Sequence, residues 1–483
     1  MSVWSTQASL VLPATCGSAK SFNVRCCVFL IYYFCLSDVC LQFFPYTIAA
    51  ALRYLPELIL YVLVLALLWK KPKIRAFPLF WPLIISMASM LVSCLLNHAN
   101  PLSAVSDFRS FFRFSAFSYI LWRTKMTPER VKQFLSGFLG VAMLELAIGA
   151  IELVGGNGIR ELFSPVSSWS SGGMIKFEYN AAQAGTWLNG TLLNYNNYGM
   201  FMAMSTVLAL ALYSLSRARK HLLIAAACAV AVLLSYSRHS LLLLVAGLTL
   251  MAWMYRRNLF RLGRGTRATF VSVFIALALL ICVALSPSMQ KRIISSFAPS
   301  VIQGDPYANV RMYMTVTLTP RFLRAYPFFG QGPFSADEMI PAGANATDYS
   351  DWGPTMKAAP EIPGWITYFI ADVVWVMVLG LYGCFGLAAF MLVFGTIARQ
   401  AIRLSKVSTD STLIALGRAC TVTTVLVLVS GFFGEEMIDR DTIPVFWYLA
   451  GIVFSLADGL EINHRGGAQG KASVSRWDVG AKA

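Results

Sequence analysis

Long apolar runs, separated by short polar segments, recur along most of this chain. A helix that crosses a bilayer needs ~20 mostly apolar residues, and about twelve runs approach that length. They cover residues 26–44, 47–69, 77–96, 107–122, 134–154, 198–215, 222–235, 241–255, 268–285, 372–397, 418–433 and 445–457. The pattern predicts an all-α polytopic membrane protein with about twelve transmembrane helices.

The composition supports this prediction. Of the 483 residues, 57% are hydrophobic and 13% are charged, and the mean hydropathy is +0.63. Soluble domains do not have such a composition. The ten cysteines form no C-x-x-C pair and no Cys/His cluster, so the sequence indicates neither a disulfide framework nor a zinc site.

Basic residues predict the orientation of the chain in the membrane. The formal net charge is +16, and most of the 39 basic residues fall on one side if the spans alternate in direction. Basic residues mark the cytoplasmic side of membrane proteins, and this explanation is preferred to nucleic-acid binding. Both termini are therefore predicted to lie in the cytosol. The groups lie at 20–25, 70–75, 123–132, 217–220, 256–267, 399–406 and 465–482.

This topology divides the chain into cytosolic ends, membrane spans and two long outer loops. Loops of such length are usually functional. The parts are a cytoplasmic N-terminal segment at 1–25, nine spans within 26–285 that include an outer loop at 155–197, a large outer loop at 286–371, three spans within 372–460, and a cytoplasmic tail at 461–483.

Nine ionisable residues lie within or at the edges of the apolar runs. Each costs ~2.5–3.5 kcal/mol in a bilayer, so such residues are candidates for a functional site. In the predicted topology eight of the nine fall in the outward half, which favours a polar cavity that opens away from the cytosol. Arg53 and Glu57 are four residues apart on one run and are expected to pair with each other. The nine are Asp38, Arg53, Glu57, Arg109, Arg113, Glu145, Glu152, Arg238 and Asp372.

Arg238, in Ser237-Arg238-His239, follows the seventh run at its predicted outer end. A guanidinium at this boundary can hold a phosphate through two hydrogen bonds. An interfacial arginine that extends toward water is an equally good explanation. His239 adjoins Arg238, so it could contact the same phosphate, although a lone histidine is more often structural.

Three further arginines lie in the large outer loop. Arg311 precedes Arg321 and Arg324, whose spacing places both on one face if this segment is helical. Pro327 and Gly330 would then end the helix. A solvated amphipathic helix is the alternative explanation.

Asp372 stands at the start of the tenth run. Trp375 shares its helix face at i+3. An acidic side chain in the first turn is favoured by the helix dipole, so a capping role is one interpretation. A general base that faces the same cavity as the arginines is the other.

Four segments follow one another in a recognisable order. Residues 185–199, GTWLNGTLLNYNNYG, form an asparagine-rich segment, and Ser237-Arg238 follow it. Arg311 then precedes 326–332, YPFFGQG, and Gly383-Cys-Phe-Gly386 begins eleven residues after Asp372. Together these segments resemble the O-antigen polymerase and ligase superfamily of bacterial envelope glycosyltransferases, in which a histidine stands at the position of Asp372.

The likeness covers about 185–394 and departs from the ligase pattern at one place. The ligases have a histidine where this chain has Asp372, followed by asparagine where this chain has Val373. Trp375 stands at the position of the family's tyrosine. An aspartate at this position favours the polymerase branch.

The resemblance implies a GT-C-like fold in the bacterial inner membrane, with the active site facing the periplasm. The donor would be an undecaprenyl-pyrophosphate-linked oligosaccharide and the acceptor a second glycan, with a flippase and a chain-length regulator as further partners. The scheme requires no metal or other cofactor. Its catalytic residues would be Asp372, Arg238 and Arg311, and its substrate-binding residues Arg321, Arg324, His239, Asn194, Asn196 and Trp375.

Two other functions stay open at this stage. A ligase would move the same glycan to a lipid A–core sugar or to a protein hydroxyl. A flippase for lipid-linked oligosaccharides belongs to a different class, because alternating access needs polar groups on both sides of the midplane and often inverted repeats. The embedded charges of this chain are one-sided, which favours the enzyme.

Overall fold

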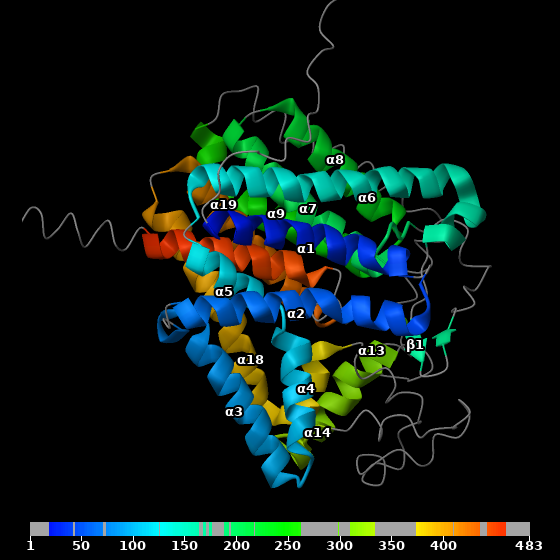
Figure 1. Ribbon diagram of the computed structural model, residues 1–483, viewed down its shortest axis with the longest axis vertical. Coiled ribbons are helices and arrows are strands. Elements are labelled where there is room, and N and C mark those ends of the chain that lie inside the picture. The colour runs from blue at the N-terminus through cyan, green and yellow to red at the C-terminus, as the bar shows by residue number, and fades with distance from the viewer. Residues whose placement is uncertain are drawn as a thin grey trace, which may run out of the picture.

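The computed structural model is built almost wholly of helices (Figure 1). It describes residues 19–41, 44–70, 74–124, 126–163, 168–170, 173–175, 188–192, 195–216, 218–261, 298, 310–333, 373–408, 410–434 and 442–459. The first half contains α1 Ala19–Leu41, α2 Tyr46–Lys70, α3 Phe80–Leu96, α4 Pro101–Phe112, α5 Ser115–Thr124, α6 Pro128–Phe163, α7 Tyr195–Ser216 and α8 Arg219–Leu234. The second half contains α9 Arg238–Arg261, α13 Val310–Tyr313, α14 Thr319–Ala325, α18 Val374–Val407, α19 Ser411–Ser430 and a last helix, Ile443–Gly459.

Five of these helices have stretches long and apolar enough to cross a membrane, which supports the prediction of a helical membrane protein. Shorter apolar helices occupy four more of the predicted runs: Arg25–Ser37, Tyr54–Trp69, Phe80–Leu96 and Ile443–Gly459. The predicted run at 268–285 lies outside the described residues. The five are Phe134–Gly156, Tyr195–Leu215, Arg238–Tyr255, Val374–Val407 and Ser411–Ser430.

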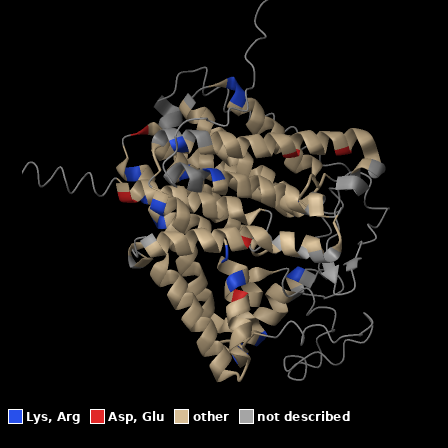
Figure 2. Cartoon of the chain, in the orientation of Figure 1, with Lys and Arg blue, Asp and Glu red and all other residues tan. Residues whose placement is uncertain are grey.

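Helix α7 lies at the centre of the bundle, where it packs against α8, α9 and α19 (Figure 1). Apolar side chains cover all of its faces, and a helix that is apolar all round is stable only when it is buried. Every described side chain from Asn196 to Ala211 is buried. Lys and Arg gather toward the left-hand helix ends in Figure 2, whereas acidic positions on α6 lie to their right.

The predicted run at 107–122 is two helices rather than one span. Helix α4 begins earlier, at Pro101, where the Asn100 side chain accepts a hydrogen bond from the backbone N–H of Leu102 (2.9 Å). It ends at Phe112, and α5 starts at Ser115. At the break, Arg113 turns toward Glu57 and the Phe114 ring packs on Phe34, 5.1 Å between centroids. Arg113 and Phe114 thus separate the two helices, and their side chains contact different partners.

Helix α2 contains a proline, and a neighbouring helix compensates for it. Pro56 has no N–H to donate to the carbonyl of Leu52. The hydroxyl of Tyr33 on α1 donates to that carbonyl instead, at 2.7 Å. This bond keeps the carbonyl satisfied in an apolar surrounding, where no water is present to do so.

The main irregularity in the bundle is a break in α18 at Gly383. This glycine has φ 66° and ψ −167°, a conformation that is essentially restricted to glycine. The break separates the N–H groups of Cys384 and Phe385 from the carbonyls of Gly380 and Leu381, which would be their partners in a regular helix. Four backbone groups near the kink thus need other partners.

The segment Tyr326–Gly332, which we call the glycine loop, supplies all four partners. The carbonyls of Pro327 and Phe328 accept from Cys384 and Phe385 at 2.9 and 3.1 Å. In return, the N–H groups of Gln331 and Gly332 donate to Gly380 and Leu381 at 2.9 and 3.0 Å. Two helical hydrogen bonds are replaced by four bonds between segments about fifty residues apart in the chain.

Close approach of the two backbones requires glycine on both sides. A Cβ on Gly330, which has φ 69°, would lie 2.3 Å from the carbonyl carbon of Leu381. A Cβ on Gly383 would lie 2.3 Å from the carbonyl carbon of Phe328. The two glycine motifs found in the sequence therefore form one structural unit.

Helices α3 and α4 hold this unit from the other side. The Ser93 hydroxyl donates to the Leu381 carbonyl at 2.8 Å, and the Asn97 side chain donates to the Gly330 carbonyl at 3.1 Å. The hydroxyl of Tyr382 donates to the carboxylate of Asp107 on α4 at 2.5 Å. The kink in α18 is thus fixed on several sides.

Replacing Gly383 by Ala tests whether the bundle depends on this unit. The strained backbone and the clash with Phe328 should together lower the free energy of unfolding by about 3 kcal/mol or more. Gly395→Ala on the same helix is the matched control, because its Cβ would meet nothing within 4 Å and alanine is the better helix former by about 1 kcal/mol. Thermal unfolding of the two detergent-purified variants measures the difference, and equal melting temperatures would contradict the expectation.

Candidate functional site

The start of α7 and the start of α9 meet at Ser237. The hydroxyl of Ser237 donates to Asn196 Oδ1 at 2.7 Å and lies 3.1 Å from His239 Nδ1. Ser240 joins the group, with its hydroxyl oxygen 2.8 Å from Ser237 Oγ and its backbone N–H donating to the same atom at 3.2 Å. All four side chains are buried. We call these four residues the Ser237 cluster.

A close contact between α7 and α9 brings the cluster together. A Cβ on Gly199 would lie 2.4 Å from Ser240 Oγ, so only glycine allows the two helices to approach this far. Asn196 precedes Gly199 by three residues and therefore shares its helix face. This geometry explains how two motifs forty residues apart in the sequence meet.

The turn between α8 and α9 presents Ser237, Arg238 and His239 at one place. Tyr236 has φ 55°, which is uncommon for a residue other than glycine, asparagine or aspartate. Residues held in such conformations cost about 1–3 kcal/mol and cluster at functional sites. Arg238 follows as the first residue of α9, and it is exposed, whereas its neighbours on both sides are buried. The turn thus separates an exposed cation from a buried polar cluster.

Arg311 lies close enough to His239 for its positive charge to act on the ring. The arginine is half-buried on α13, and the segment that follows it, Met314–Leu318, is a π-helix. Such turns often mark functional sites. Arg311 and the Ser237 cluster, which the sequence placed in separate segments, are therefore brought to the same region.

Arg321 and Arg324 lie on α14, which confirms that this segment is helical. Both are exposed, and Phe322 between them is buried against Gly380 of α18, where a Cβ would come within 2.9 Å of its ring. The helix ends at Ala325, just before Pro327 and Gly330, as predicted. Packing by Phe322 fixes α14 on α18 and leaves the two arginines on the outside.

Two buried carboxylates hold the loop that leads into α7. Glu152 on α6 accepts hydrogen bonds from the backbone N–H groups of Asn189 and Gly190 at 3.1 and 3.0 Å. Glu145 accepts from the N–H of Thr191 at 2.9 Å and also from its hydroxyl. The sequence patterns did not predict this role for the two acids. Their i, i+7 spacing put them on one face of α6, but nothing local identified backbone N–H groups forty residues later as their partners.

The predicted outer loop at 155–197 therefore differs in part from the expectation. Residues 188–192 are buried against α6 rather than exposed, because Glu145 and Glu152 need these N–H donors. Helix α6 also continues to Phe163, beyond a kink at Gly156. A short antiparallel pair, β1 Ser168–Ser170 and β2 Gly173–Ile175, follows within the same loop.

Trp375 is buried between α18 and α19. Its indole N–H donates to the Leu428 carbonyl at 2.8 Å, and its ring packs against Phe390 and Phe432 with centroids 5.8 and 5.7 Å away. This environment gives the side chain a packing role. Asp372 and Asn194 lie outside the described residues.

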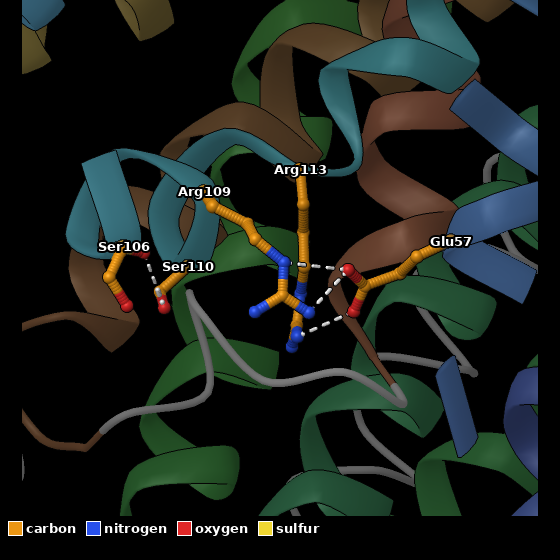
Figure 3. Close-up of polar contacts among 5 residues, drawn as sticks. All are labelled: Glu57, Ser106, Arg109, Ser110 and Arg113. Atoms are coloured by element: carbon orange, nitrogen blue, oxygen red, sulfur yellow. Dashed lines mark hydrogen bonds and ion pairs between the residues drawn. The ribbon is translucent and has the colours of Figure 1, made fainter. Parts of the chain in front are cut away.

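Glu57 binds Arg109 and Arg113, partners that lie more than fifty residues away (Figure 3). From the sequence we expected Glu57 to pair with Arg53, because the i, i+4 rule predicts pairs only within one helix. The side chain of Arg53 lies outside the described residues.

Comparisons with known proteins leave the family open: no family model matches the chain, and no curated protein matches it. Among the described residues, no group of three His, Cys, Asp or Glu could hold a metal ion.

Replacing Ser237 by Ala tests the cohesion of the cluster. The change removes the atom shared by Asn196, His239 and Ser240, and we expect the free energy of unfolding to fall by about 1–3 kcal/mol. Ser405→Ala is the control, because the Ser405 hydroxyl bonds only locally to the carbonyl of Ile402 among the contacts described. Chemical or thermal unfolding in detergent gives both values. A Ser237 variant as stable as the Ser405 variant would count against a shared polar cluster.

Proposed function

We propose that the protein is a glycosyltransferase of the bacterial inner membrane that joins lipid-pyrophosphate-linked repeat units at the periplasmic face. One observation carries the proposal: the four segments that resemble the polymerase and ligase superfamily meet in pairs. Asn196 bonds to Ser237, the charge of Arg311 acts on His239, and the glycine loop bonds to the kink in α18. Chance similarities scattered along a sequence have no reason to meet in this way.

Arg238 and Arg311 would hold the pyrophosphate of the donor. Arginine suits this role because it stays charged and its planar fork matches phosphate oxygens. Arg238 adds a cation to the positive end of the α9 dipole, so this helix end favours an anion strongly. Arg321 and Arg324, exposed on α14, would guide or hold the attached sugars.

The reaction is a displacement at the anomeric carbon of the donor sugar. The acceptor hydroxyl attacks that carbon, and the bond to the lipid pyrophosphate breaks. The arginines would stabilise the negative charge that grows on the leaving pyrophosphate. Asp372, two residues before the start of α18, would take the proton of the acceptor hydroxyl.

The orientation follows from the basic residues. Their concentration toward one set of helix ends supports a cytosolic side there and a periplasmic site at the other ends (Figure 2). A flippase would deliver the lipid-linked units to this face, and a separate regulator would set the chain length.

Replacing single charges tests the assignment in cells that depend on this protein for polymer. Arg238→Ala or Arg311→Ala should lower polymer synthesis by about 10²–10³-fold, and Asp372→Asn by about 10²–10⁴-fold. Arg399→Ala, an exposed arginine near the opposite end of α18, is the control and should leave synthesis unchanged. Gel profiles of the glycan, with immunoblots of membrane protein, give the result. Near-normal polymer from the Arg311 variant would reject its role.

A purified sample separates the polymerase from its rivals. In detergent micelles, a polymerase should lengthen lipid-linked oligosaccharide into products with several repeats still attached to the lipid carrier. A ligase would instead move the glycan to a lipid A–core or peptide acceptor, and a flippase would leave all substrates unchanged. Mass spectrometry of the products distinguishes the three outcomes.

A further inference from the structure

Two arginines converge on one buried carboxylate between α2 and α4. Arg109 donates to Glu57 Oε2 through Nε at 3.0 Å and through Nη2 at 2.6 Å, and Arg113 Nη1 donates to Oε1 at 3.0 Å (Figure 3). Both contacts are ion pairs. We call Glu57, Arg109 and Arg113 the Glu57 triad.

The triad carries a net charge of one positive unit in an apolar region. Exposure rises across it: the side chain of Glu57 is 5% exposed, that of Arg113 17% and that of Arg109 38%. Removing charges from water is costly unless they are compensated. Two guanidiniums share the single carboxylate of Glu57, and Arg109 is the more accessible of the two, so a further anion would bind the triad at Arg109.

The surface beside Arg109 is apolar and faces outward. Tyr54, Leu58, Tyr61 and Leu65 recur every three to four residues on α2 and are 58%, 59%, 37% and 64% exposed. The guanidinium of Arg109 lies 5.5 Å from the ring centroid of Tyr54. In a bilayer this stripe contacts lipid chains. An anion attached to a long apolar tail fits both features, with its charge at Arg109 and its tail along the stripe.

The position of the triad also matches a break in the helical structure. Arg113 lies at the interruption between α4 and α5. Within a membrane, interrupted helices occur where the backbone lines a polar space or is buried in protein. Helix α2 packs against α5, whereas α4 packs against α3, so the triad spans the place where α4 diverges from α2.

We propose that the Glu57 triad binds the phosphate group of a membrane lipid. This inference rests on the proposed function for the identity of that lipid. A polymerase must hold two lipid pyrophosphates at once, and Arg238 with Arg311 accounts for the donor. The triad is a second place where two guanidiniums converge, so it takes the lipid pyrophosphate of the acceptor.

Glu57 has a defined role in this scheme. Its carboxylate occupies the space between the two guanidiniums and holds them in place while the site is empty. It also competes with the incoming phosphate. Removing its charge should therefore strengthen binding, whereas removing an arginine should weaken it. If the ion pairs were purely structural, the two substitutions would not change phosphate binding in opposite directions.

The test uses the full-length protein in detergent and a short-chain isoprenyl pyrophosphate as the probe. An Arg311→Gln background weakens the donor site, so the part of the remaining binding that depends on Arg109 reports on the triad. Adding Arg109→Gln should weaken binding about ten- to a hundred-fold, because one charge-assisted contact is lost. Adding Glu57→Gln should tighten binding several-fold. Adding Arg399→Gln, the matched loss of one exposed positive charge elsewhere, should leave it unchanged. Native mass spectrometry and calorimetric titration give the affinities.

Two further probes show which kind of phosphate compound the triad binds. Inorganic pyrophosphate, which lacks the tail, should bind at least tenfold more weakly than the isoprenyl form. Phosphatidylglycerol should also bind more weakly. Equal, Arg109-dependent binding of phosphatidylglycerol would retain the lipid phosphate site and overturn its assignment to the acceptor.

Two results would overturn the site itself. One is probe binding in the Arg311→Gln background that Arg109→Gln does not change, and the other is a Glu57→Gln variant that binds more weakly than its parent. Melting temperatures of all variants show whether a loss of binding merely follows unfolding. Failure of the polymer assays would reject the proposed function but would not alter these binding affinities.

Discussion

The kink in α18 depends on hydrogen bonds that the helix itself cannot make. An apolar bundle has no water to satisfy backbone groups, so each donor and acceptor freed at Gly383 must find a protein partner. The glycine loop provides them, and its own groups are satisfied in the same exchange. This exchange of hydrogen bonds connects α14, with its two arginines, to the long helix that begins two residues after Asp372. The spatial arrangement of the candidate site rests on that bond set.

The same constraint explains the buried acids. Glu57, Glu145 and Glu152 are each inside the bundle, where an unpaired carboxylate would be strongly unfavourable. Two of them accept backbone N–H groups at the entry to α7, and the third binds two arginines. They act at two separate places: Glu145 and Glu152 position the start of α7, and Glu57 bridges α2 and α4.

These contacts bear directly on the proposed chemistry. The loop held by Glu145 and Glu152 leads into Asn196, which bonds to Ser237 beside Arg238. The glycine loop continues the segment that carries Arg311. Polar groups that would handle a charged substrate are therefore positioned by backbone contacts deep in the bundle rather than by flexible surface loops, as precise catalytic geometry requires.

The sequence by itself determined the helical class and the approximate positions of most helices, because hydropathy and helix propensity act over one or two turns. It also identified the residues whose side chains could take part in binding or catalysis. It also identified α14 and its end, since Pro327 and Gly330 are local signals. It did not reveal that 107–122 is divided, that Glu57 binds Arg109 and Arg113, or that Trp375 is packed against α19. Only the tertiary structure decided these pairings, because each joins segments whose approach depends on how all the helices pack together.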